Sequence, residues 1–236
     1  MQFINLTPLD ITIGHMENEL FYADQVFPKS EKAARVTEET TPATPIDGIA
    51  VNNVKLLEVE NLPEPQEGVR YIVSMPVQQF ATGRNDLVSP YSEKAARKGN
   101  DILGVPAFVR YTALTKQHDA KEKTEAQFSK FVNMTFQDVT IRTGNEERKI
   151  QKSGTVVKIR TEETDVEELG DFKCYTIQFC EIENLPAPQE GVIYIVPMPV
   201  AQAAADRNDV YAADTGASAI RDNGRLVAFT ALARYV

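Results

Sequence analysis

The sequence predicts an α+β protein that is mainly β and consists of two tandem homologous units. Residues 60–86 (ENLPEPQEGVRYIVSMPVQQFATGRND) recur as residues 183–209 (ENLPAPQEGVIYIVPMPVAQAAADRND), with 20 of 27 positions identical. Apolar and polar residues alternate through much of each half, as in half-buried strands, and only one short stretch per half has helical spacing. Each unit should therefore be a small antiparallel sheet with one short helix. We expect the units to pack as a pseudo-two-fold pair, because a fused pair commonly descends from a homodimer; the alternative is two separate units joined by a charged linker.

Each half begins with a series of strands. The opening segments FINLTPLDITI and FVNMTFQDVTI both alternate between apolar and polar residues, which predicts one strand in each half. The next predicted strand is better defined in the second half, with Thr155, Val156, Val157 and Ile159, and the strand after it is β-branched in both halves. The predicted pairs of strands are 3–13 with 131–141, 28–40 with 151–164, and 51–63 with 173–186.

A proline turn, a short strand and a helix come next. The prolines of LPEPQEG and LPAPQEG interrupt a strand ladder, and Gly68 and Gly191 permit a sharp re-entry into the strand Val-x-Tyr-Ile-Val. A helix is predicted after this strand, because Pro76 suits a first helical turn and apolar residues follow at helical spacing. Each half closes with a strand, at residues 105–114 and 225–236.

The repeats set the predicted domain boundaries. The first repeat unit covers residues 1–115, a charged linker covers 116–129, and the second repeat unit covers 130–236. The first unit contains a segment, residues 15–26 (HMENELFYADQV), that has no counterpart in the second, and the sequence assigns it no role.

Charge and composition exclude several classes of partner. The net charge of −9 disfavours binding to a nucleic-acid polymer, although a local pocket can still hold a small anion. No window approaches the apolar length of a membrane span, and the N-terminus lacks the pattern of a secretory signal. We therefore expect no membrane partner. Cys174 and Cys180 are expected to be free thiols in a reducing cytoplasm.

Motifs for catalysis and for cofactors are missing. The only histidines, His15 and His118, have no counterparts in the other half, and neither metal-ligand spacings nor phosphate-binding glycine loops occur. We expect no metal, no cofactor and no enzymatic activity. Acidic residues such as Glu58 and Glu181 do recur, so a carboxylate-dependent hydrolase is a weaker alternative.

Residues that recur in both halves are the candidates for ligand binding. Arg84-Asn85-Asp86 recurs as Arg207-Asn208-Asp209. Arginine presents a planar fork to a phosphate or carboxylate, and Asn and Asp can read sugar hydroxyls or base edges. The same triplet also suits a turn that ends a helix.

Four further pairs of recurring polar or aromatic residues complete the candidate set. In the opening strand, an amide and a hydroxyl would lie on the same face and could bind a ligand together. The alternative is that this face is the polar outer face of an edge strand. The glutamines lie on the short helix, and the alternative to ligand binding is a simple surface position. The tyrosines could stack on a base, and the alternative is that they are core or groove residues. The pairs are Asn5 with Asn133, Thr7 with Thr135, Gln79 with Gln202, and Tyr71 with Tyr194.

With INLTPLDITI at its start and ENLPEPQEGVRYIVSMPV in its middle, each half resembles a family of short phage and prophage proteins. These open with an INLTPH-like strand, carry an LPEPQEGTxYIVS core, and close with RxD, a turn and a final strand. Leu9 stands where the family usually has histidine, so any role of that histidine does not transfer to this chain.

The resemblance implies a phage protein made in the cytoplasm of a bacterial host. Compact acidic phage proteins of this kind include anti-defence proteins that sequester nucleotide signals of bacterial immunity, such as cyclic ADP-ribose-like molecules, ADP-ribose conjugates and cyclic oligonucleotides. The leading hypothesis is therefore sequestration of a small nucleotide-type signal. The alternative is a protein–protein interaction module, either an inhibitor of a host defence protein or a virion-associated adaptor.

Overall fold

A computed structural model describes residues 1–99, 101–112, 130–216, 218–222 and 225–236. The chain forms two compact units, and neither is a continuous stretch of sequence. Unit 1 comprises Met1–Thr37, Leu57–Ala113 and Thr161–Phe179, and unit 2 comprises Glu38–Leu56, Leu114–Arg160 and Cys180–Val236. Each unit thus includes a piece of the other half. The predicted linker, 116–129, lies outside the described residues.

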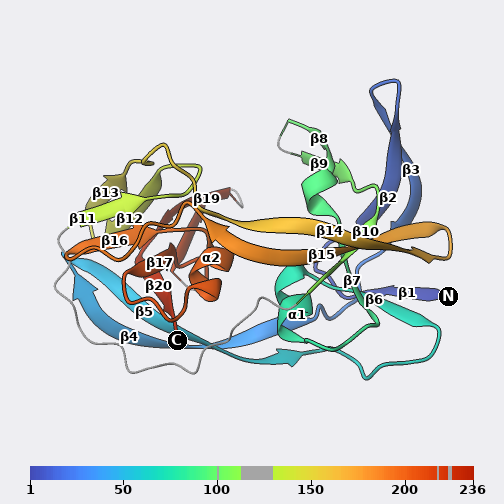
Figure 1. The fold of residues 1–236 in the computed structure, drawn as a ribbon, viewed down its shortest axis with the longest axis horizontal. Helices are drawn as coiled ribbons and strands as arrows, with labels where there is room; N and C mark the ends of the chain where they lie inside the picture. The colour runs from blue at the N-terminus through green and yellow to red at the C-terminus, as the bar shows by residue number, and fades with distance from the viewer. Residues whose placement is uncertain (100, 113–129, 217, 223–224) are drawn as a thin grey trace. The chain divides into compact units, whose positions relative to one another are not determined.

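Short strands and one short helix make up most of each unit (Figure 1). The elements of unit 1 are β1 (Gln2–Asn5), β2 (Ile11–Glu17), β3 (Leu20–Phe27), β6 (Val69–Ile72), α1 (Met75–Phe80), β7 (Leu87–Pro90), the 3-10 turn η1 (Ser92–Lys94), β8 (Ala96–Lys98), β9 (Asp101–Gly104) and β10 (Phe108–Tyr111). Those of unit 2 are β11 (Lys130–Asn133), β12 (Val139–Thr143), β13 (Glu146–Ile150), β16 (Val192–Ile195), α2 (Met198–Ala203), β17 (Val210–Ala213), β18 (Ala219–Asp222), β19 (Arg225–Phe229) and β20 (Ala231–Tyr235).

Two long hairpins complete the sheets. They are β4 (Arg35–Ile46) with β5 (Ile49–Glu60), and β14 (Lys158–Leu169) with β15 (Phe172–Glu183). The six-stranded sheet of unit 1 has the order β1-β6-β7-β10-β15-β14, and that of unit 2 has the order β11-β16-β17-β20-β5-β4. Each hairpin therefore extends the sheet made by the other half of the chain. Strand β15 pairs with β10, and β5 pairs with β20.

The mainly β class and the two short helices are confirmed, but the six-stranded sheets are mixed, so the prediction that each unit is an antiparallel sheet was wrong for them. β1 with β6, β6 with β7, and β10 with β15 are parallel, whereas β7 with β10 is antiparallel. The physical reason is the connection: parallel neighbours need a crossover, and α1 supplies one between β6 and β7. The equivalent pairs in unit 2 have the same directions.

The predicted opening strand is also broken in both units. Strand β1 ends at Asn5 and β2 begins at Ile11, and β11 and β12 are separated in the same way. Hydrogen bonds from the side chains of Asn5 and Thr7 hold the intervening turn, as described below. β1 therefore joins the six-stranded sheet, whereas β2 pairs with β3.

Residues with positive φ lie at the turns of the long hairpins. In the β4–β5 turn Asp47 and Gly48 have φ of 49° and 77°, and in the β14–β15 turn Gly170 has φ of 67°. Asp-Gly is a strong signal for a two-residue hairpin turn, because both central residues of that turn need positive φ. The dipeptide Asp47-Gly48 therefore indicates a hairpin turn in the sequence itself. It does not indicate which sheet the hairpin joins.

Four buried apolar clusters form the cores, two in each unit. In unit 1 one cluster lies between the six-stranded sheet and α1 and includes Tyr71, Val77 and Leu87. The other covers the opposite face of the sheet and includes Ile72, Phe108 and Cys174. Cys174 comes from the β14–β15 hairpin, which belongs to the second half of the chain but joins the sheet of unit 1; we call β14–β15 and β4–β5 the exchanged hairpins. The hairpins therefore contribute to the cores as well as to the sheets.

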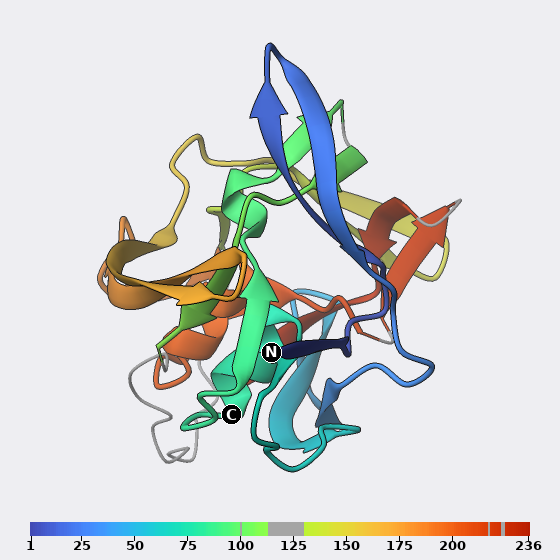
Figure 2. The ribbon, with the colours of Figure 1, turned by 90° about the vertical axis from the view of Figure 1, so that its right-hand side faces the viewer.

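The segment 15–26, which has no counterpart in the second half, lies in the β2–β3 hairpin. This hairpin projects from unit 1 in both ribbon views (Figures 1 and 2). Phe21 of this hairpin lies against two glycines. A Cβ on Gly14 would lie 2.1 Å from the carbonyl oxygen of Tyr22, and a Cβ on Gly104 would lie 2.3 Å from the Phe21 ring. Glycine is thus required where β2, β3 and β9 approach one another.

Candidate functional site

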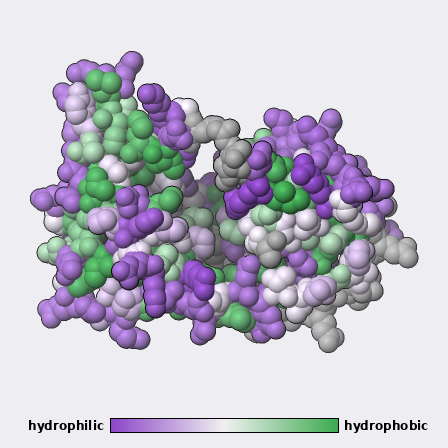
Figure 3. All heavy atoms as spheres, turned by 180° about the vertical axis from the view of Figure 1, so that it is seen from behind, coloured by the Kyte–Doolittle hydropathy of each residue, from purple (hydrophilic) through white to green (hydrophobic). Residues whose placement is uncertain are grey.

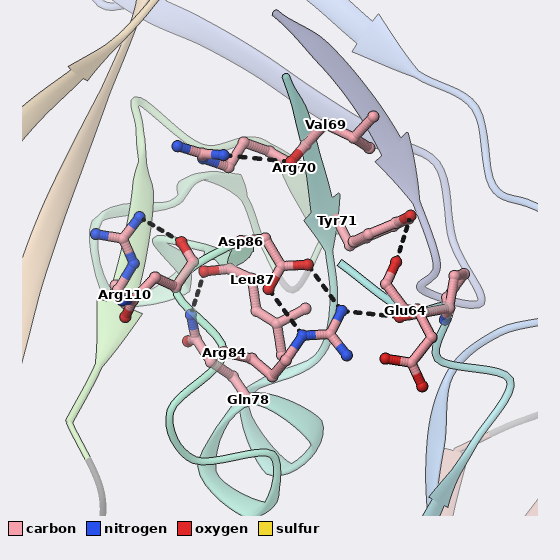
Figure 4. A network of polar contacts seen from close by, with 11 residues as sticks. Glu64, Val69, Arg70, Tyr71, Gln78, Arg84, Asp86, Leu87 and Arg110 are labelled. Atoms are coloured by element: carbon pink, nitrogen blue, oxygen red, sulfur yellow. Dashed lines mark hydrogen bonds and ion pairs between the residues drawn. The ribbon is translucent and has the colours of Figure 1, made fainter. Parts of the chain in front are cut away.

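The repeated Arg-Asn-Asp triplet forms the turn that connects α1 to β7. The guanidinium group of Arg84 binds the carboxylate of Asp86 through Nε–Oδ1 (2.8 Å) and Nη2–Oδ2 (2.7 Å). Nη2 also donates to the carbonyl oxygen of Pro63, at 2.8 Å, in the proline turn. Arg84 therefore ties the turn after the helix to the loop before β6 (Figure 4).

The second triplet has the same geometry in unit 2. Arg207 binds Asp209 through Nε–Oδ1 (2.9 Å) and Nη2–Oδ2 (2.6 Å), and Nη1 donates to the carbonyl oxygen of Pro186 at 2.6 Å. Its guanidinium carbon also lies 5.7 Å from the ring centre of Tyr194. The geometry of both triplets favours the structural interpretation, in which arginine and aspartate hold a turn.

The ion pair changes the chemistry of Asp86. The Asp86 side chain is only 10% exposed, and the hydrogen bonds from Arg84 lower the pKa of its carboxyl, because they stabilise the charged form. A carboxylate held in this way is a weak base. Asp86 is therefore poorly suited to proton transfer.

An open depression lies beside this turn in unit 1. Its volume is about 320 Å³, and its lining residues are Pro65, Arg70, Gly83, Arg84, Asn85 and Asp86. Figure 4 shows the cationic side of this region, where the guanidinium groups of Arg70 and Arg110 lie on one side of the strands, away from that of Arg84. Two of the lining residues, Arg70 and Arg84, are arginines, in a chain whose net charge is −9.

Arg70 and Arg110 are the charged residues here that the sequence analysis missed. Nη1 of Arg110 donates to Oε2 of Glu167 at 2.9 Å, and its Nη2 donates to the carbonyl oxygen of Asn85 at 3.0 Å. Arg70 makes one long hydrogen bond, from Nη1 to the carbonyl oxygen of Val69 at 3.3 Å. Among the described residues Arg70 has no carboxylate partner within ion-pair distance, and its buried Nε has no hydrogen-bond acceptor.

Arg70 does not recur in the second half of the chain. Arg70 lies opposite Phe3 of β1, and Ile193 lies opposite Phe131 of β11 at the same place in unit 2. Recurrence in both halves selected the candidate residues, and this position is arginine in one half and isoleucine in the other. A charged residue in one half at a position that is apolar in the other was the available signal.

Asn5 and Thr7 use their polar groups within the protein. Nδ2 of Asn5 donates to the carbonyl oxygens of Leu9 and Phe27, both at 2.9 Å, while Oδ1 accepts from the backbone N–H and the hydroxyl of Thr7. The Thr7 hydroxyl lies 2.8 Å from the carbonyl oxygen of Leu9 as well. This saturates the Asn5 amide, so it is not free to bind a ligand.

Asn133 and Thr135 repeat this arrangement in unit 2. Nδ2 of Asn133 donates to the carbonyl oxygens of Gln137 and Ile150, and Oδ1 accepts from the backbone and hydroxyl of Thr135. Asn5 and Asn133 are 2% and 1% exposed. The pattern of an Asn followed by a Thr therefore marks a buried turn rather than the polar outer face of a strand.

The remaining candidates are scattered. Tyr71 and Tyr194 are buried in the cores, which agrees with the structural alternative for them. The buried Nε2 of Gln79 has no hydrogen-bond partner, whereas Gln202 forms a hydrogen bond with Tyr235. Asn208 is half-buried, whereas Asn85 is exposed at the depression.

Of the predicted site residues, the depression brings together Arg84, Asn85 and Asp86, and it adds Arg70 to them.

Within the described residues no group of three or more His, Cys, Asp or Glu side chains is placed to hold a metal ion. None of the helices in the described part of the chain is both long enough and apolar enough to cross a membrane. A scan against protein-family models found no match. Searches of curated proteins and of solved structures likewise found no significant similarity.

Proposed function

We propose that the chain is a phage-encoded, non-enzymatic protein that binds and sequesters a small nucleotide-type signal of bacterial immunity in the host cytoplasm. The observation that carries this proposal is the depression in unit 1. Its wall contains Arg70, whose guanidinium group has no carboxylate partner among the described residues, beside the exposed amide of Asn85. Such a fork suits a phosphate, and an adjacent amide suits a sugar hydroxyl or a base edge.

The size of the depression agrees with a small ligand. A volume of about 320 Å³ lies at the lower end of the range for small-molecule sites. Arg84 and Asp86 neutralise each other, and Arg110 is paired with Glu167, so the charge offered to a ligand is that of Arg70. This favours a ligand with one phosphate or pyrophosphate group over an extended polyanion.

The proposal includes an origin by tandem duplication. The halves have similar sequences, their six-stranded sheets have corresponding strand orders, and each sheet receives a hairpin from the other half. An ancestor of one repeat would have formed such sheets only as a dimer that exchanged hairpins. The pseudo-two-fold packing of the repeats stays a prediction.

Thermal unfolding against a panel of ligands tests the proposal. The panel contains ADP-ribose, cyclic ADP-ribose isomers and cyclic oligonucleotides, with adenosine as the matched ligand that lacks phosphate. Binding at one hundred times Kd adds about 2.7 kcal/mol, which raises the melting temperature by several degrees. Mass spectrometry before incubation and after heat release must recover the ligand unchanged, because an altered ligand would indicate the hydrolase alternative. A panel without any shift contradicts the proposal.

A protein–protein interaction module is the second candidate, and the β2–β3 hairpin favours it. Apolar side chains are visible on the projecting hairpin in Figure 3. Met16, Leu20, Tyr22 and Val26 are each more than 40% exposed, and Ile102 and Leu103 of β9 are also exposed. In bacteria that carry a nucleotide-signalling defence, a Leu20→Ser/Tyr22→Ser variant should retain anti-defence activity if the protein acts on the signal. Loss of activity in that variant would support the interaction module.

A further inference from the structure

The two units differ at the place where unit 1 has its depression. Strand register equates Arg70 with Ile193 and Val88 with Tyr211, because Val88 lies opposite Ile72 and Tyr211 lies opposite Ile195. Ile193 and Tyr211 are 0% and 1% exposed and belong to one apolar cluster of unit 2. Unit 2 therefore has two large, buried side chains where unit 1 has a guanidinium group and a valine.

The two units also differ in the hydrogen bonding of a neighbouring arginine. Arg110 lies on β10 and Arg234 on β20, at corresponding positions in the two six-stranded sheets. Arg234 donates from Nε to Oδ1 of Asn53 at 2.8 Å and forms a hydrogen bond with Tyr211. Nε of Arg110 is buried and has no acceptor. The Nε donor of Arg234 is thus hydrogen-bonded within unit 2, whereas the equivalent donor of Arg110 lacks an acceptor in unit 1.

Buried donors without acceptors are costly, and arginine donors especially so. Two such Nε atoms, on Arg70 and Arg110, lie in the same part of unit 1. An anion bound at this point would supply acceptors for a guanidinium group that has no carboxylate within ion-pair distance among the described residues.

We infer that the chain has a single anion-binding site, in unit 1, where Arg70 binds one phosphate or pyrophosphate group and Arg110 lies beside it, while Ile193 and Tyr211 fill the equivalent place in unit 2. Arg84, the more conspicuous residue in the sequence, holds the turn. This inference rests on the proposed function for the identity of the ligand, although the site itself does not depend on a nucleoside. The ratio of ligand to chain is one.

Isothermal titration with inorganic pyrophosphate and with ADP-ribose tests the site. The variant Arg70→Ile introduces the residue that unit 2 already has at this position, so the sheet should accommodate it. The matched control is Arg97→Ile, which removes the same charge from an exposed position on β8. We expect one site per chain for wild type and for Arg97→Ile, and a loss of affinity of at least tenfold for Arg70→Ile. Arg70→Lys should retain part of the affinity, because it keeps the charge but not the fork.

Stability separates a binding role from a structural one. Because Arg70→Ile removes a buried donor that lacks an acceptor, its melting temperature without ligand should equal or exceed that of wild type. A variant that loses both stability and binding would overturn the inference, and so would two sites per chain or unchanged affinity for either probe.

The two probes keep this result distinct from the proposed function. Pyrophosphate binding that depends on Arg70, with no nucleotide bound, would support the site and contradict the nucleotide proposal. Nucleotide binding that does not depend on Arg70 would support the proposed function and overturn this site. If neither probe nor any nucleotide binds, both fail.

Discussion

The guanidinium group of Arg84 and the carboxylate of Asp86 form two parallel hydrogen bonds across a single intervening residue. Both side chains are largely buried, at 21% and 10% exposure, and the arginine also bonds the carbonyl oxygen of Pro63. The pair therefore connects the end of α1 to the proline turn that precedes β6. Removing one partner of a largely buried, hydrogen-bonded pair leaves the other charge without compensation, so it costs more than removing one partner of an exposed pair.

Replacing Asp86 by alanine should lower the free energy of unfolding by about 3 kcal/mol, because it leaves the charge of Arg84 largely buried and without its partner. Urea denaturation measures this change. Glu60→Ala is the matched control, since the Arg35–Glu60 pair has side chains 71% and 42% exposed. The control should lose less than about 1 kcal/mol. Equal losses in the two variants would show that the Arg84–Asp86 pair has no special role.

The same carboxylate should make stability depend on pH. The pKa of Asp86 is lower in the folded protein than the ordinary value of 3.8, so its contribution is fully present above that value and is lost as the pH falls through the folded pKa. Asp86→Asn cannot titrate at this position. The difference in unfolding free energy between wild type and Asp86→Asn should be constant from pH 6 to pH 5 and should shrink below pH 3.8. A difference that stays constant in acid would mean that Asp86 titrates normally.

Asn5→Ala should destabilise unit 1, and Asn133→Ala should destabilise unit 2. Each change removes the acceptor for a backbone N–H and the donors for two carbonyl oxygens in a buried turn. We expect a loss of about 2 kcal/mol for each variant in urea denaturation. Gln25→Ala, at an exposed amide on β3, serves as the control and should change stability by less than about 0.5 kcal/mol. If the asparagine variants behave like the control, these residues are free for another role.

The sequence was informative wherever a local rule decides the structure. The α1 helix follows from Pro76 and the apolar residues after it, and the turn at Arg84–Asp86 was the stated alternative to a ligand site. The partner of each hairpin could not be predicted, because β5 and β15 come from similar halves and suit either sheet. Alternation of residues defines which face of a strand is buried, but not which sheet it joins.

The site was less predictable than the fold for a different reason. Recurrence selected Asn5, Thr7 and the two arginines of the triplets, and the geometry uses these residues for turns that both units need. A pocket present in one unit requires residues that the other unit lacks. The aligned repeats place Arg70 where the second half has Ile193, and the strand register confirms this equivalence, with Arg70 opposite Phe3 and Ile193 opposite Phe131.

The two cysteines should report on the exchanged hairpin β14–β15. Cys174 is 1% exposed and pairs with Phe108 in the sheet of unit 1, and burial raises its pKa to about 11. Cys180 is partly exposed. With a thiol reagent at pH 8, the Cys180→Ser variant should react at least tenfold more slowly than Cys174→Ser, because the thiolate is the reactive species. Similar rates in the two variants would show that the hairpin opens readily.

Cutting the chain between the two halves should leave the fragments associated. A protease site placed within residues 113–129 would yield two fragments, each of which supplies a hairpin to the sheet of the other. Leu169, Cys174 and Ile177 are buried in unit 1, and Ile49, Val51 and Val54 are buried in unit 2. Each large apolar side chain contributes about 1.5 to 3 kcal/mol when it is fully buried, so separation would require both units to open.

The cleaved protein should therefore elute as one species in gel filtration, with the volume of the uncut chain, and should separate only in denaturant. The uncut protein with the same inserted site is the control for any effect of the insertion itself. Because the fragments are no longer covalently joined, the melting temperature of the cleaved protein should rise with protein concentration, whereas that of the control should not. Elution as two separate fragments in native buffer would contradict the exchange of hairpins.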